Sequence, residues 1–142
     1  MEQTLSAFLK ENKIKREAYE YVASKDFVDG EGNPIPWKIR PLTNEELDNL
    51  RDRFTKRVKN KMTQKTEEVF DKEGFTMEMA TTAIEFPKLD DAQLQESYGV
   101  VGADSLLNAM LTPGELQDLF LAVNEASDFE VGMGQKIKQA KN

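Results

Sequence analysis

Apolar side chains recur every three or four residues over most of the chain, a spacing typical of helices with one buried face. In the clearest case, Leu47, Leu50, Phe54 and Val58 follow one another at spacings of three, four and four. This pattern predicts helices over about residues 44–59, 75–85, 90–98, 102–111 and 112–127.

A different pattern precedes these helices. Residues 17–29 are rich in aromatic and β-branched side chains, and apolar and polar residues alternate over residues 35–40, around Trp37. Both features are typical of strands. The intervening Gly-Glu-Gly-Asn-Pro of residues 30–34 is typical of a turn. We therefore predict a β-hairpin over about residues 17–40, with Trp37 on its apolar face. Such a hairpin needs a helix or a third strand beside it.

Several residues mark helix boundaries. Thr43–Glu46 is a capping box, and Thr112–Glu115 combines the same box with a proline at the first helical position. Asp90 is expected to cap the helix over 90–98, with Gln93 completing the box. Gly99 is expected to end that helix in a left-handed conformation.

Three other segments are less regular. Residues 1–12 predict either a short amphipathic helix, with Leu5, Phe8 and Leu9 on one face and Thr4 as N-cap, or a loose terminus. Residues 60–74 are predicted to be a loop, with Val69-Phe70 as either an anchor or a short strand, and residues 129–142 a flexible tail. The expected fold is α+β. It is a mostly α-helical single domain over residues 1–128, with an N-terminal β-hairpin packed on the helices.

Composition excludes several kinds of chemistry. The 142 residues include no cysteine and no histidine, so disulfides, cysteine–histidine zinc sites and thiolate or imidazole catalysis are excluded. No apolar run approaches the ~20 residues that a membrane span needs, and the N-terminus lacks the order of a signal peptide. We expect a cytoplasmic protein that does not bind membranes.

Charge is distributed unevenly along the chain. The net charge is −7, and residues 100–131 carry six acidic side chains and no basic one. Residues 132–142 carry three lysines and no acid. An acidic C-terminal half repels phosphate backbones, so nucleic acid is not an expected ligand. The acidic surface fits either a basic partner or a solvated face that aids solubility.

Two weak motifs were weighed for chemistry. Asp29, Glu31 and Asn33 alternate as in a calcium loop, but Pro34 and Arg40 stand where that loop needs glycine and glutamate. Adjacent carboxylates at residues 90–91 are explained by helix capping, although a small metal-dependent hydrolase stays an alternative. The sequence therefore predicts no enzyme, no catalytic residue, no metal and no cofactor.

Two segments together resemble the XkdN-like family of phage tail assembly chaperones, found in phages and defective prophages of Gram-positive bacteria. The first is Gly-Asn-Pro-Ile-Pro-Trp-Lys-Ile-Arg-Pro-Leu-Thr at residues 32–43. The second lies within residues 86–115 and includes Phe86-Pro87, Leu94-Gln95-Glu96-Ser97-Tyr98-Gly99 and Met110-Leu111-Thr112-Pro113-Gly114-Glu115. The resemblance covers roughly residues 5–130.

The resemblance implies a non-enzymatic chaperone. Such proteins bind the tape-measure protein, keep its long helical chain soluble and help tube subunits polymerise around it. The tail tube protein is a further partner that the resemblance allows, and self-association stays open. A structural tail component, such as a completion or connector protein retained in the particle, is the alternative.

A helical partner would be recognised through apolar anchors in a groove. The candidate groove residues are Leu106, Leu107, Met110, Leu116, Leu119 and Phe120. The alternative is that all six belong to the core, because apolar stripes at helical spacing usually do.

Overall fold

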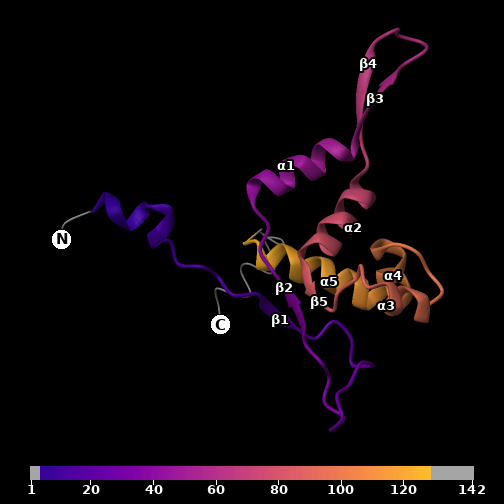
Figure 1. Ribbon diagram of the computed structural model, residues 1–142. Helices are drawn as coiled ribbons and strands as arrows, with labels where there is room; N and C mark the ends of the chain where they lie inside the picture. Colours follow the sequence, from indigo (N-terminus) through magenta and orange to yellow (C-terminus); the bar gives the residue numbers. More distant parts are fainter. Residues whose placement is uncertain (1–3, 129–142) are drawn as a thin grey trace, which may run out of the picture.

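The computed structural model describes residues 4–128, and it shows a helical body with two projections (Figure 1). The body contains the helices α1 (Asn44–Arg53), α2 (Lys72–Ala83), α3 (Ala92–Ser97), α4 (Ala103–Met110) and α5 (Pro113–Ala126). Its sheet consists of the strands β1 (Tyr19–Tyr21), β2 (Trp37–Ile39) and β5 (Ile84–Phe86). The projections are an N-terminal arm and a hairpin of β3 (Thr55–Lys59) and β4 (Thr66–Phe70). The fold is α+β, as the sequence predicts.

The sheet of the body has the order β1-β2-β5, and both pairings are antiparallel. Tyr21 lies opposite Trp37, and Ile39 lies opposite Ile84. The connection from β1 to β2 turns back at Asp29, whose carboxylate accepts hydrogen bonds from the backbone N–H groups of Glu31 and Asn33. This carboxylate therefore closes a turn, in place of the calcium loop that the sequence analysis rejected.

The core lies between the sheet and the helices. Trp37 and Ile39 on the inner face of β2 are buried, and Lys38 between them is exposed. This is the alternation that the sequence shows. The helices contribute the remainder of the largest fully buried side chains, which are Leu106, Leu107, Leu119 and Val123.

Both predicted capping boxes are confirmed. At the start of α1, the Thr43 hydroxyl accepts from the Glu46 N–H at 3.1 Å, and the Glu46 carboxylate accepts from the Thr43 N–H at 3.0 Å. Thr112 and Glu115 make the same pair of bonds at the start of α5. These reciprocal bonds satisfy amides that have no partner inside the helix.

The helix predicted over residues 44–59 is wrong in its second half. Helix α1 ends at Arg53, and residues 55–59 form β3, which pairs with β4 from Thr55 opposite Phe70 to Lys59 opposite Thr66. Val58 continues the helical spacing of the apolar residues in α1, but it lies in β3 and its side chain is half exposed. Its spacing therefore does not reflect a buried helix face. The predicted loop over 60–74 accordingly contains β4 and the start of α2.

The helix predicted over 75–85 is displaced. Helix α2 begins at Lys72 because Asp71 caps it, accepting from the Gly74 N–H at 3.0 Å. It ends at Ala83, and the next three residues form β5. Gly74, predicted to lie in the loop, is part of α2, and a Cβ there would meet the Phe54 ring at 2.8 Å. The glycine therefore lets α2 approach the end of α1.

The last three helices are close to the predicted ranges. Helix α3 is shorter than 90–98, and Asp91 caps it, accepting from the Leu94 N–H at 2.8 Å. The predicted box of Asp90 and Gln93 is therefore wrong by one position. Gly99 has a φ of 65°, which confirms the predicted left-handed stop.

The arm, residues 4–16, lies away from the body on the side of β1 (Figure 1). It contains two short 3₁₀ helices, η1 (Leu5–Phe8) and η2 (Lys10–Asn12), and neither has a buried residue. Thr4 makes no side-chain cap, so neither an α-helix nor its predicted cap is present. The tail predicted over 129–142 lies outside the described residues.

Candidate functional site

An apolar cavity of about 350 Å³ opens between the sheet and the α3–α4 region. It is lined from the β1–β2 connection, the facing ends of β2 and β5, and the helices α3 and α4. The lining residues are Phe27, Ile35, Trp37, Phe86, Pro87, Leu94, Ser97, Tyr98 and Met110. Nearly all are apolar or aromatic, as is typical of sites that bind apolar groups.

The cavity has a buried floor and an exposed rim. Trp37 is 2% exposed and forms part of the floor, whereas Phe86 and Tyr98 are 47% and 37% exposed. Met110 on α4 is half-buried and packs against the core while lining the cavity. Aromatic side chains that are this exposed at the edge of an apolar cavity offer contact area at little cost in conformational entropy.

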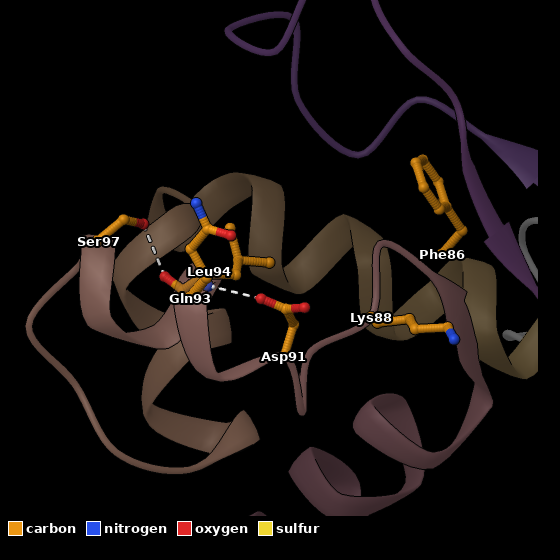
Figure 2. A pocket seen from close by; sticks show the side chains of 6 residues that line it. All are labelled: Phe86, Lys88, Asp91, Gln93, Leu94 and Ser97. Carbon is orange, nitrogen blue, oxygen red and sulfur yellow. Dashed lines mark hydrogen bonds between the residues drawn. The ribbon is translucent and has the colours of Figure 1, made fainter.

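A second cavity, of about 500 Å³, adjoins the first, and both are lined by Phe86, Leu94 and Ser97. In Figure 2, Phe86 and Lys88 lie on one side and the side chains of α3 lie on the other. The dashed lines in that view are the hydrogen bonds of Leu94 with Asp91 and Ser97. We refer to the two cavities together as the aromatic groove.

Local hydrogen bonds fix the wall that α3 contributes. The side chain of Gln95 donates to the carbonyl of Leu89 at 2.8 Å and accepts from the Gly102 N–H at 3.0 Å. It thereby ties the segments before and after α3 to each other. The wall of the groove is held by its own helix caps and by this amide, so it does not need a partner to form.

The groove offers little reactive chemistry. Its charged lining residues are Lys88 and Asp91, and the carboxylate of Asp91 is already used as a helix cap. Among residues 4–128, no group of three or more carboxylates is placed to hold a metal ion. In the same residues, no helix is long and apolar enough to cross a membrane. The arrangement suits binding by shape and apolar contact.

The structure divides the six groove residues predicted from the sequence. Leu106, Leu107 and Leu119 are fully buried and belong to the core. Leu116 and Phe120 on α5 are half-buried against that core, and Met110 lines the aromatic groove. The helical stripe that selected these residues is therefore mainly the inner face of α4 and α5.

Most groove residues were missed by the sequence prediction of contact residues. Phe27, Ile35 and Phe86 come from the hairpin and from a strand that the sequence did not reveal, so no periodicity joins them to Met110. A usable signal was present, since Phe86 and Tyr98 are aromatic residues beside a proline and a glycine at element boundaries. Aromatic residues at such boundaries often lie at the surface of the core.

Comparison with protein families gives a match over almost the whole chain. The matching family is described as "Phage XkdN-like tail assembly chaperone protein, TAC", and the match covers residues 5–141. Two proteins of Bacillus subtilis (strain 168) are also similar. They are the phage-like element PBSX protein XkdN and the uncharacterized protein YqbN. Each is 28% identical over an alignment of 141 positions, which covers 97% of this chain and 93% of the relative.

The fold is also similar to a solved structure. The crystal structure of YqbN superposes with a TM-score of 0.74, covering 92% of this chain and 100% of that one. The sequence identity is 24%, so this similarity establishes the fold alone.

Proposed function

Since this chain belongs to the XkdN-like family of phage tail assembly chaperones, we propose that it binds the tape-measure protein and assists assembly of the tail tube. The observation that carries the proposal is the family match over residues 5–141, because it links the whole fold to tail assembly. The proposed role is non-enzymatic and belongs to the cytoplasm of the bacterial host. The tail tube protein is a further proposed partner.

The aromatic groove is the proposed binding surface. A tape-measure protein is a long helical chain, and an amphipathic helix is bound by a groove that accepts its apolar side chains at positions i, i+3 and i+4. Phe86 and Tyr98 are exposed enough to make such contacts, and Met110 can adapt to different side chains because it is unbranched. Binding would cover the exposed aromatic residues of the groove and the apolar face of the helix, and it would thereby keep both proteins soluble.

This assignment modifies the set of contacts expected from the sequence. Met110 is retained as a contact residue, and Phe27, Ile35, Phe86 and Tyr98 are added. Leu106, Leu107 and Leu119 act indirectly, by holding α4 and α5 in place. Leu116 and Phe120 are half-buried and would contact a partner only at their exposed edges.

Co-expression with the tape-measure protein of the same locus tests the proposal. The soluble yield of the tape measure should rise, and the two chains should elute as a complex. Phe86→Asp should weaken the complex at least about tenfold, because it places a charge at an apolar contact. The matched control is Val101→Asp. It adds the same charge at a side chain that is 91% exposed and outside the lining of the groove.

Two outcomes would contradict the proposal. If the tape measure's solubility does not change and no complex elutes, the chaperone role through this partner is lost. If a complex forms but Phe86→Asp and Val101→Asp behave alike, with circular dichroism showing both variants folded, the groove is not the binding surface. Stoichiometric amounts of the chain in purified particles would instead favour a structural tail component.

A further inference from the structure

The arm presents apolar side chains that its own body does not cover. Leu5 and Phe8 are 81% and 82% exposed, and Ile14 is 86% exposed. Leu5 and Phe8 lie three residues apart in η1, and a 3₁₀ helix places such residues on the same side. An exposed apolar stripe of this kind is typical of a segment that docks on another surface.

The aromatic groove has the complementary property. It is an apolar surface with exposed aromatic rims and a preformed wall, and residues 4–128 leave it open. The molecule therefore carries both halves of an apolar contact, one on the arm and one on the body.

The two halves are also complementary in charge. Residues 4–16 carry four basic side chains and one acidic one, and the basic residues are Lys10, Lys13, Lys15 and Arg16. Residues 85–104, which include β5's end and α3, carry five acidic side chains and one basic one. The groove itself is lined by one lysine and one aspartate, so the other acidic residues flank the contact. Opposite charges that flank an apolar contact favour this pairing chiefly by speeding the encounter.

The geometry directs the arm to another molecule. Arg16 at the root of the arm pairs with Asp128, just beyond the end of α5. From that root the arm extends to one side of the body, whereas α3 lies on the other side (Figure 1). The sheet order β1-β2-β5 also puts β2 between β1, which follows the arm, and β5, which carries Phe86. In this structure the arm therefore points away from its own groove.

We propose that the aromatic groove of one copy receives the arm of a second copy, so that the chain forms a dimer by exchanging its N-terminal arms. Phe8 and Leu5 enter the groove beside Phe86 and Tyr98, and the lysines of the arm lie near Asp91, which caps α3, and Glu96 within it. Reciprocal exchange closes the assembly, because both arms and both grooves are then occupied. A tape-measure helix that binds the same groove would displace the arm, so the dimer is the form of the chain before it meets that partner. The proposal does not depend on the tape-measure protein, and its test uses this chain alone.

Sedimentation velocity of the full chain over a range of concentrations is the first test. The chain should form dimers, and Phe8→Asp should raise the dissociation constant at least about tenfold. Ser6→Asp adds the same charge at a polar position of the same arm and should change the constant by about twofold or less. Added salt should weaken the dimer because the charges near the contact are screened.

Site-directed cross-linking is the second test, and the absence of native cysteine makes it specific. Ala7→Cys, next to Phe8 in η1, and Ser97→Cys, in the lining of the groove, keep the aromatic contact residues. These two variants are mixed and mildly oxidised, and a disulfide should form between the two chains. Ala7→Cys mixed with Met62→Cys, at the 95% exposed tip of the β3–β4 hairpin, is the control pair and should cross-link much less. A monomer at every concentration overturns the proposal. It is equally overturned by a dimer insensitive to Phe8→Asp, or by equal cross-linking of the two pairs.

Discussion

In the body of the molecule most large apolar side chains face one another, and the rim of the aromatic groove is an exception, whereas in the two projections such side chains face solvent. Leu106, Leu107 and Leu119 are fully buried between the helices and the sheet. On the arm and on the β3–β4 hairpin, by contrast, Leu5, Phe8 and Met62 are almost fully exposed. Both regions contain apolar residues at regular spacing, but in the body alone does the spacing coincide with burial.

This difference distinguishes the apolar side chains that stabilise the fold from those that are free to contact a partner. Apolar area removed from water contributes about 25 cal/mol per Å², so the body holds most of the free energy that opposes unfolding. Exposed apolar side chains on the projections add little to that free energy and remain free to contact another surface. We therefore expect substitutions in the buried core of the body to change stability, and those at exposed apolar side chains of the arm or the aromatic groove to change association.

The largest expected effect in this comparison comes from Leu106→Ala. Leu106 is fully buried, and removing its isobutyl group leaves a cavity in the core. Replacements of this kind typically lower the free energy of unfolding by about 2–5 kcal/mol. Urea denaturation followed by circular dichroism measures the loss. The control, Leu5→Ala on the arm, should change it by less than about 0.5 kcal/mol. Equal losses of unfolding free energy in the two variants would contradict the division between a stabilising core and a solvent-exposed arm.

The same contrast between buried and exposed apolar residues determines how much of the fold could be predicted from the sequence. Periodicity located α4 and α5 well, because each has one apolar stripe that faces the core, and α5 also begins with a capping box and a proline. It failed at Val58, where the helical spacing of α1 continues by coincidence into a strand that faces solvent. A pattern of spacing records which residues share a face, and it contains no information on whether that face is covered.

The groove was predicted less well than the fold for a related reason. Met110 was identified from its own helix, whereas Phe27 and Phe86 reach the groove from segments about 60 residues apart in the sequence. Their meeting depends on the pairing of β2 with β5, and β5 is three residues long. A strand this short shows no recognisable alternation, so the sequence could not place Phe86 beside Met110.

An intermediate effect is expected from a charge at the edge of the body. Arg40, just after β2, binds Glu46 of α1 through two hydrogen bonds of 3.0 and 2.6 Å. The hydrogen bonding by Arg40 lowers the pKa of Glu46 from 4.5 to about 2. A carboxyl group whose pKa is lower in the folded protein stabilises it above the unfolded pKa. That contribution is lost as the pH falls from about 4.5 to about 2.

Glu46→Gln should therefore lower the free energy of unfolding at pH 7 by about 1–2 kcal/mol, which allows for partial solvent screening of the pair. Its stability should also depend less on pH between about 4.5 and 2, as measured by urea denaturation at several pH values. Glutamine still completes the capping box, so the helix start is preserved. Glu115→Gln is the matched control, because Glu115 completes the other box and its lowered pKa arises first from the Thr112 backbone. If both variants lose the same stability, Arg40 contributes nothing specific.

The smallest effect on the free energy of unfolding is expected from Val69→Thr in β4. The same replacement at a buried position of the body serves as the comparison. Val69 lies opposite Lys56 in the projecting hairpin and is about half exposed. Threonine has nearly the same shape and the same preference for strands, so the free energy of unfolding should change by less than about 0.5 kcal/mol. Val123→Thr makes the same replacement on α5, where the side chain is 1% exposed, and the buried hydroxyl should cost about 1–3 kcal/mol. Chemical denaturation of the two variants compares one substitution in two environments. A loss at Val69 as large as that at Val123 would mean that the hairpin is covered in solution, and the division between body and projections would then have to be redrawn around it.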